Sequence, residues 1–192
     1  MKKRKLSVLL LVGVTLILLS LVLVSIFLIR GQIGAVKCRE VAEKMQALLP
    51  EKSPGVPELY GDPNMPVLEI DGKDYVALLE IPAWDLTLPV ADSWNKDRLY
   101  EGPARFSGSA YDGTLVIGGV DDARQLGFCD KIENGTEVTV TDMTGASFSY
   151  TVSRVDRAKQ ADARWLMNSE FDLTLFCRDL YSMEYVAVRC SH

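Results

Sequence analysis

The chain has 192 residues, enough for one domain with appended segments, and contains 21 basic and 26 acidic side chains. Residues 1–30 hold five basic and no acidic side chains, which leaves 16 basic against 26 acidic residues, a net charge of −10, in the remainder. This acidic remainder argues against nucleic acid as a partner. Four dispersed cysteines and a single histidine form no zinc-binding pattern, and no metal or cofactor is expected.

The N-terminus has the pattern of a membrane anchor. Four basic residues, 2–5, precede an apolar run over residues 6–29, which Arg30 closes. As a helix, this run spans about 36 Å, enough to cross a bilayer with some tilt. The excess of basic residues before the run predicts a single-pass protein of the cell membrane, with a cytoplasmic N-terminus and an extracellular C-terminal domain. Cleavage after Ile33-Gly34-Ala35 is the alternative.

Three segments are expected: residues 1–30 with the anchor, residues 31–66 as a juxtamembrane helix and linker, and residues 67–192 as the folded domain. Apolar residues at 41, 45, 48 and 49 recur with helical spacing, which favours a stalk that continues the anchor, or a docking helix. Five of the eight prolines lie between Pro50 and Pro66, which is typical of a stiff linker at a domain boundary.

The segment from 67 to 192 alternates short extended runs with turn signals. Val67–Ile70 and Tyr75–Ile81 flank Asp71-Gly72, a pattern that predicts a hairpin. Further strands are predicted at 86–90, 114–117, 137–141, 147–154, 173–176 and 185–189, and short helices at 121–128 and 160–167. Many short strands with two small helices indicate a mainly β fold, a closed or nearly closed barrel.

Free thiols are the expected state of the cysteines. In a hairpin centred near Ser182, Cys177 opposes a residue near 187, which leaves Cys190 about 10 Å further along its strand. This separation exceeds the reach of a disulfide between Cys177 and Cys190.

Several phrases of the domain resemble sortases, the cysteine transpeptidases that attach proteins to Gram-positive cell walls. Leu173-Thr-Leu-Phe-Cys177 is similar to that family's Leu-Thr-Leu-x-Thr-Cys strand, and Val186-Ala-Val-Arg189 to the strand after it. YVALLEIPAWDLTLPV, residues 75–90, resembles the family's opening strands, and Ile117-Gly-Gly119 resembles the approach to its catalytic histidine. The resemblance covers about 120 residues in order. It implies an eight-stranded sortase-like β-barrel outside the membrane.

The resemblance implies a nucleophilic cysteine, a histidine that donates a proton and an arginine that stabilises the oxyanion. The histidine position holds Val120, the arginine position holds Tyr185, and an ungapped match places Arg178 at the nucleophile position. Cys177 then points to the opposite face of its strand. A deletion before Cys177 would shift the register and return it to the groove, which stays an alternative. The only histidine, His192, falls roughly 20 Å away along the last strand.

These substitutions predict an extracytoplasmic sortase-like protein that is catalytically inactive, a pseudoenzyme that binds a sorting-signal peptide, a pilin or a partner sortase. The alternative is an active transpeptidase that attaches surface proteins to the cell wall through Cys177, with a non-standard proton carrier. A purely structural domain with a closed groove is a third possibility. Asp121 and Asp122 could form an acid/base pair or a cation site, although a helix N-terminus explains them more simply.

Overall fold

The computed structural model describes residues 2–55, 62–168 and 170–192, without the side chains of residues 2–10, 27–33, 35, 97 and 98. Contacts divide the chain into two compact units, residues 1–34 and residues 35–192. Part of the linker expected between 50 and 66, residues 56–61, lies outside the described residues.

The chain begins with a single continuous helix, α1 (Lys2–Leu48). Within the residues that the structure describes, no helix is both long and apolar enough to cross a membrane. The anchor expected at residues 6–29 falls partly on side chains outside the described set, and it stays a prediction.

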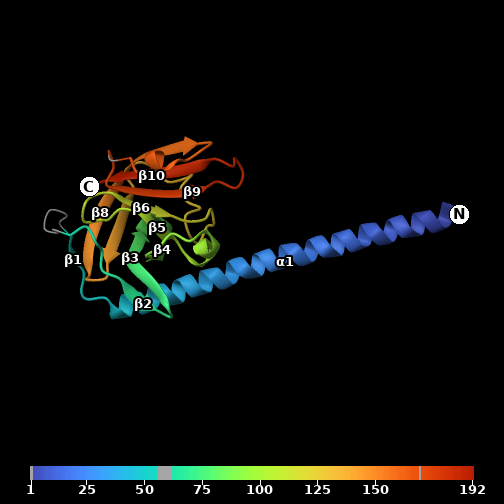
Figure 1. The fold of residues 1–192 in the computed structure, drawn as a ribbon, viewed down its shortest axis with the longest axis horizontal. Coiled ribbons are helices and arrows are strands. Elements are labelled where there is room, and N and C mark those ends of the chain that lie inside the picture. Colours follow the sequence, from blue (N-terminus) through green and yellow to red (C-terminus); the bar gives the residue numbers. More distant parts are fainter. Residues whose placement is uncertain (1, 56–61, 169) are drawn as a thin grey trace. The chain divides into compact units, whose positions relative to one another are not determined.

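Ten strands of the described residues form one sheet (Figure 1). They are β1 (Ser53–Pro54), β2 (Leu68–Ile70), β3 (Lys73–Ile81), β4 (Leu86–Ala91), β5 (Ala104–Ser107), β6 (Leu115–Gly118), β7 (Glu137–Asp142), β8 (Ala146–Ala158), β9 (Leu173–Arg178) and β10 (Tyr185–Ser191). Hydrogen-bonded neighbours run β8-β10-β9-β6-β5-β4-β3, and β7 closes the ring by pairing with both β3 and β8. Eight strands therefore form a closed barrel, as expected, with β1 and β2 attached to its rim.

The predicted hairpin is confirmed. Asp71 and Gly72, at φ 52° and 73°, form its two-residue turn, and both adopt the left-handed conformation that such turns require. Antiparallel pairing joins Leu68 to Tyr75 and Ile70 to Lys73. The turn residues therefore set the register of β2 on β3.

The barrel is filled by alternate residues of its strands together with the loop after β6. Leu79 of β3, Ile117 of β6, Phe148 of β8, Leu175 of β9 and Val188 of β10 are 0 % exposed. They belong to one continuous core cluster. Period-two alternation of apolar residues explains which side of each strand faces this core.

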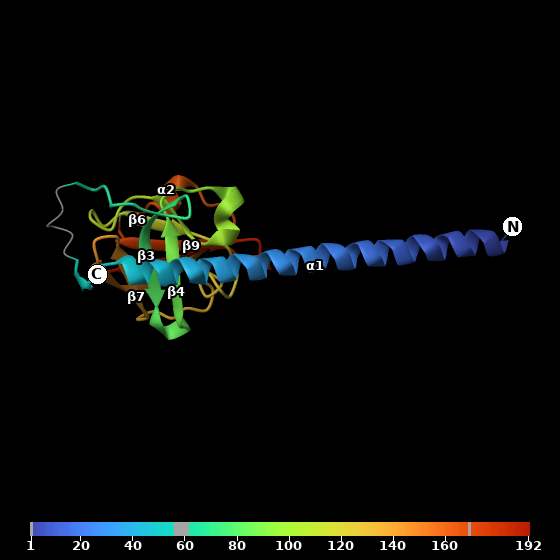
Figure 2. The same ribbon diagram turned by 90° about the horizontal axis from the view of Figure 1, so that it is seen from below.

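The last turns of α1 belong to the barrel unit instead of forming a free stalk. Val41, Ala42 and Met45 are buried against Ile70 and Leu78 of β2 and β3. Figure 2 shows the end of α1 lying alongside β3. Apolar residues spaced three and four apart explain this contact, because they form one stripe on the helix surface. The linker also adds β1, which pairs in parallel with the start of β8.

The short helix predicted at residues 121–128 is absent from the structure. Residues 121–128 form a series of turns, because the chain folds back where the Gly127 N–H donates to the Asp122 carbonyl at 2.9 Å. A Cβ at Gly127 would lie 2.6 Å from the Asp122 carbonyl carbon, so the close approach needs glycine. The other helix exists as α2 (Ala163–Leu166), with the Asp162 carboxylate as its N-cap, accepting from the Trp165 N–H at 2.8 Å. Short 3₁₀ turns, η2 (Pro82–Trp84) and η3 (Lys96–Glu101), complete the described elements.

Candidate functional site

The outer surface of β6, β9 and β10 is apolar and is covered by α2 and a rim of mainly aromatic side chains, and we call it the aromatic face. Its floor consists of one outward-pointing residue from each strand, and its rim is aromatic. The floor residues are Val116, Phe176 and Ala187, covered by Leu166 of α2, and the partly buried residues around them are Trp94, Phe106, Ala161, Trp165 and Tyr185. The floor residues are at most 4 % exposed, so the part of this face that a ligand could contact is the partly buried, mainly aromatic rim.

Three rings pack against one another at the centre of this face. The centroids of Trp94 and Phe106 lie 5.4 Å apart, and Phe176 is 5.3 Å from Trp94 and 5.5 Å from Phe106. Two of the three pairs are edge-to-face, a favourable arrangement for aromatic rings. Gly118 allows this packing, because a Cβ there would overlap the rings of Trp94 and Phe176.

Strict alternation along β9 decides where Cys177 lies. Leu173, Leu175 and Cys177 belong to the barrel core, whereas Phe176 belongs to the aromatic face. Cys177 is 3 % exposed, and its thiol donates to the Leu126 carbonyl at 3.5 Å. The register that would turn Cys177 toward the groove is not the one present, and Cys177 does not reach the aromatic face.

Arg178 is the next residue, and its side chain is exposed at the end of β9. It lies opposite Tyr185 in the β9–β10 ladder, with its guanidinium carbon 5.7 Å from the centre of that ring. Its Nε donates to the Met183 carbonyl at 3.3 Å. Among the residues described, no carboxylate forms an ion pair with Arg178. Arg178 and Tyr185, two of the positions matched to the family's catalytic residues, are therefore neighbours.

Val120 follows β6, and its side chain is partly exposed. Its carbonyl accepts from the backbone N–H groups of Asp122 at 2.9 Å and Leu126 at 3.3 Å, which hold the loop in its turns. The Asp121 carboxylate accepts from the Leu180 N–H at 3.0 Å and so joins this loop to the loop between β9 and β10. Valine offers neither a proton nor a charge to this side of the face.

Asp121 and Asp122 have separate partners, and the helix expected to explain them is absent. Arg124 binds Asp122 through two contacts of 2.9 Å, and these hydrogen bonds hold the pKa of the Asp122 carboxyl below its usual value. Among the described residues, no three His, Cys, Asp or Glu side chains are grouped to hold a metal. Each of the two carboxylates is therefore engaged in a hydrogen bond that holds a loop.

His192 lies at the other end of β10 from Tyr185. Its Nδ1 is 3.1 Å from the Ser149 carbonyl oxygen, and its ring centroid is 4.4 Å from that of Tyr150. Its backbone N–H donates to the Asp172 carboxylate at 2.9 Å. The single histidine is thus not brought to Cys177 or to Arg178.

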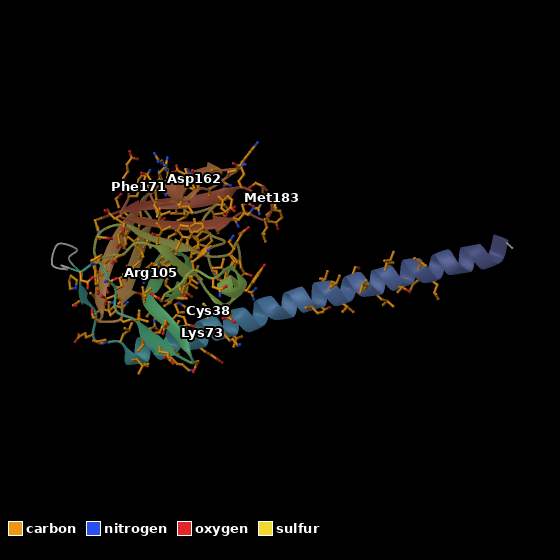
Figure 3. The ribbon with its side chains drawn as sticks, viewed as in Figure 1. Cys38, Lys73, Arg105, Asp162, Phe171 and Met183 are labelled. Carbon is orange, nitrogen blue, oxygen red and sulfur yellow. The ribbon has the colours of Figure 1, made fainter. Side chains whose placement is uncertain are left out.

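The sequence reasoning did not foresee the part played by Arg189, which lies under α2 at one side of the aromatic face. Its side chain is 1 % exposed, and it donates to the carbonyls of Trp165 and Leu166 and to the Thr174 hydroxyl. It also pairs with the Asp156 carboxylate at 3.1 Å. Figure 3 labels Asp162 and Phe171, at either end of the segment that Arg189 holds. A charged residue between buried strand positions was the only signal for this anchor in the sequence.

The loop between β9 and β10 presents apolar side chains beside Arg178. Tyr181 is 97 % exposed, Leu180 62 % and Met183 52 %, and Figure 3 labels Met183 at the tip of the loop. Asp179 organises this loop by accepting from the Tyr181 N–H at 2.7 Å and the Ser182 hydroxyl at 2.8 Å. The loop is therefore an ordered apolar projection.

A hollow of about 410 Å³ lies next to the aromatic face and shares Trp94 and Phe106 with it. Its remaining lining is mainly polar and includes Arg105, which is paired with Asp92. Its volume is within the range of small-ligand pockets. It can accept a polar side chain of a peptide that lies across the aromatic face.

The barrel is similar to solved structures of sortases. Sortase A from Corynebacterium diphtheriae is 21 % identical, with a TM-score of 0.55 over 62 % of this chain and 60 % of that one. A sortase D5 transpeptidase from Clostridium perfringens is 20 % identical, with a TM-score of 0.53 over 62 % and 78 % of the two chains. Sortase C1 from Streptococcus agalactiae is 19 % identical, with a TM-score of 0.52 over 64 % and 69 %.

At these identities the likeness establishes the fold alone. The chain spans only 60 % of the length of the first of these proteins. No protein-family model and no curated protein sequence matches the chain.

Proposed function

We propose that this chain, which has the sortase fold, is a membrane-anchored extracytoplasmic protein that binds an extended peptide on its aromatic face without transpeptidation. The bound peptide is a sorting signal, carried by a pilin or another surface protein, and a catalytically active sortase is the natural partner at the same signal. The membrane anchor is the apolar run of residues 6–29, and the domain lies outside the cell.

One observation carries the proposal: on the aromatic face, β9 presents Arg178 while its cysteine faces the barrel core. A guanidinium cannot act as an acyl-accepting nucleophile, whereas it binds carbonyl and carboxylate oxygens well. The other two matched positions, Val120 and Tyr185, supply neither an imidazole nor a fixed positive charge. Binding is therefore the chemistry that this set of side chains supports.

The remaining surface is suited to a peptide with apolar side chains. The partly buried rings of Trp94, Phe106 and Tyr185 surround the covered floor. The exposed Arg178 guanidinium lies beside Tyr185, without an acidic partner among the described residues. A cation next to an apolar strip favours a ligand with an acidic group, or a free carboxylate, at the corresponding end. A single unpaired arginine at such a site is worth about 1.5–3 kcal/mol when it forms charged hydrogen bonds.

The test measures binding and turnover together. The full chain in detergent micelles is mixed with fluorescent Leu-Pro-x-Thr-Gly peptides, affinity is read by anisotropy, and mass spectrometry monitors cleavage. We expect saturable binding that weakens at least tenfold with Arg178→Glu, and an intact peptide throughout. The matched control is Arg39→Glu, a charge reversal of an 83 %-exposed side chain on α1, which should leave the affinity unchanged.

Cys177→Ala should also leave the peptide affinity within a factor of about two, because the thiol is buried behind the floor. Turnover of the peptide that disappears in Cys177→Ala would overturn the proposal in favour of an active transpeptidase. Absence of saturable binding to every member of the peptide set, with the fold intact by circular dichroism, would exclude a peptide-binding role for this face.

A further inference from the structure

Three thiols inside the barrel take no part in the proposed binding. Cys129 and Cys190 are 0 % exposed and Cys177 is 3 % exposed, and all three belong to the same core cluster. They lie on different segments: Cys129 is within the turns after β6, Cys177 is on β9, and Cys190 is on β10. Each is a free thiol in the structure.

Two of the three thiols are adjacent. The Leu126 carbonyl accepts from the Cys129 N–H at 3.1 Å and from the Cys177 thiol at 3.5 Å, so both residues converge on one oxygen atom. The Cys129 and Cys177 side chains also lie close enough to influence each other electrostatically, and this adds to the burial that raises the pKa of the Cys129 thiol. Cys190 is placed differently: it pairs with Leu173, four residues along β9 from Cys177 and about 13 Å away.

We infer that Cys129 and Cys177 are a disulfide-forming pair, which on oxidation links the loop after β6 to strand β9. The oxidant is a disulfide, either of a thiol–disulfide oxidoreductase or of oxidised glutathione. One cysteine thiolate attacks an oxidant sulfur, forms a mixed disulfide and releases one thiolate. The second cysteine thiolate then attacks the protein-side sulfur, closes the bond between Cys129 and Cys177 and releases the other thiolate. The two protons lost by the cysteines are taken up by the two released thiolates.

Burial controls the rate of this reaction. No oxidant reaches a thiol that is at most 3 % exposed, so the exchange proceeds through opening of the loop that contains Leu126 and Cys129. Burial also raises the pKa of the Cys129 thiol well above its usual value, which keeps it protonated in the closed state. We therefore expect slow oxidation of the folded protein, which mild urea or higher pH accelerates.

The bond would fix the loop after β6 to the end of β9. The loop that carries Cys129 also carries Val120, and Asp121 joins it to the loop after β9 through the Leu180 N–H. A link between Cys129 and Cys177 closes a loop of about 50 residues and restricts the unfolded chain, as well as opening of this segment. The inference rests only on the positions of the two thiols and does not depend on the proposed peptide binding.

The experiment follows the thiols directly. The full chain in detergent is first reduced, then incubated with oxidised glutathione, and its remaining thiols are alkylated before digestion with trypsin. Cleavage separates Cys129 in residues 125–131, QLGFCDK, from Cys177 in residues 165–178, WLMNSEFDLTLFCR, and from Cys190 at the C-terminus. We expect these two peptides to be joined, with Cys38 and Cys190 alkylated, and the urea midpoint to rise on oxidation and to fall again on reduction.

Two variants make the result specific. Cys190→Ala should leave the 125–131 to 165–178 linkage unchanged, whereas Cys129→Ala should abolish it without a replacement bond between Cys177 and Cys190. Four alkylated cysteines after oxidation in mild urea would overturn the inference. Separate glutathione adducts on Cys129 and Cys177, or a bond from Cys177 to Cys190 in the unsubstituted chain, would overturn it equally.

Discussion

Replacement of Arg189 by methionine should be the most damaging single change at the side of the aromatic face. Methionine fills a similar space but cannot donate, so the carbonyls of Trp165 and Leu166 and the Thr174 hydroxyl lose their common partner. The guanidinium also lies 4.9 Å from the centre of the Trp165 ring. The change therefore releases α2, which carries part of the rim of the aromatic face.

The expected cost follows from burial. Removal of one member of a buried charged pair costs about 3–5 kcal/mol, and each buried polar group left unpaired costs about 1–3 kcal/mol. Asp156 is 20 % exposed and keeps a second partner, Arg154, at 2.8 Å, so we place the cost near the lower limit, about 3 kcal/mol. With a urea dependence of about 2 kcal/mol/M, the unfolding midpoint should fall by about 1.5 M.

Arg154→Met is the matched control, because Arg154 binds the same carboxylate of Asp156 from the surface. Its side chain is 53 % exposed, against 1 % for Arg189, and the loss of such a pair costs under about 1 kcal/mol. Urea unfolding of the full chain, followed by far-ultraviolet circular dichroism, compares the two variants. Equal destabilisation by both changes, or a cost below 1 kcal/mol for Arg189→Met, would refute the anchoring role of Arg189.

Two further predictions concern the packing of the face and its neighbouring loop. Gly118→Ala should displace the Trp94 ring, because the new methyl group overlaps the rings of Trp94 and Phe176. The free energy of unfolding in urea should fall by about 1–3 kcal/mol, and the tryptophan fluorescence should change. Unchanged stability and fluorescence would contradict this prediction. The Ser182 hydroxyl lowers the pKa of Asp179, so the loop contacts should persist above the usual aspartate pKa of about 3.9 and weaken as pH falls below it. In a carboxyl titration by NMR, Ser182→Ala should move the Asp179 midpoint upward, and no movement would exclude this hydrogen bond.

Local patterns in the sequence account for most of the barrel. Asp71-Gly72 predicts the first hairpin, which the structure has. A hairpin centred near Ser182 predicts that Cys177 pairs with a residue near 187, one position from its observed partner, Val186. That register leaves Cys190 opposite Leu173, so the two strand cysteines are too far apart to bond, as expected. Turn residues and alternating apolar positions are short-range signals, which explains why they can be interpreted without the rest of the chain.

The elements that were missed depend on distant contacts. β5 has only four residues, one of them an arginine, and it becomes a strand because β6 pairs along it. β1 contains a proline in a segment expected to be linker, and it is tolerated as a short edge strand beside β8. The apolar spacing at the end of α1 favoured a stalk over a docking helix, but the structure has the docking helix, whose apolar stripe packs against β2 and β3. Each of these depends on a partner surface that a single sequence does not display.

The candidate site, too, could be predicted from the sequence only in part. The matched positions Val120, Arg178 and Tyr185 can be named from the sequence, and alternation along one strand indicates that Cys177 and Arg178 point in opposite directions. The inward side for Cys177 follows only from the pairing of β9 between β6 and β10. The role of Arg189 depends on the carbonyls of α2, which pattern reasoning cannot place.

The most direct test of binding without transpeptidation is the reactivity of Cys177 in the folded protein. The full chain, freshly reduced, is treated with iodoacetamide at pH 7, and mass spectrometry measures the labelling of each cysteine with time and with urea. We predict that Cys177 stays unlabelled in the folded protein and that, as urea is raised, it reacts no sooner than Cys129, whose thiol is also buried. Rapid labelling of Cys177 alone in the folded protein would mean an exposed, reactive thiol and would contradict a barrel-facing cysteine.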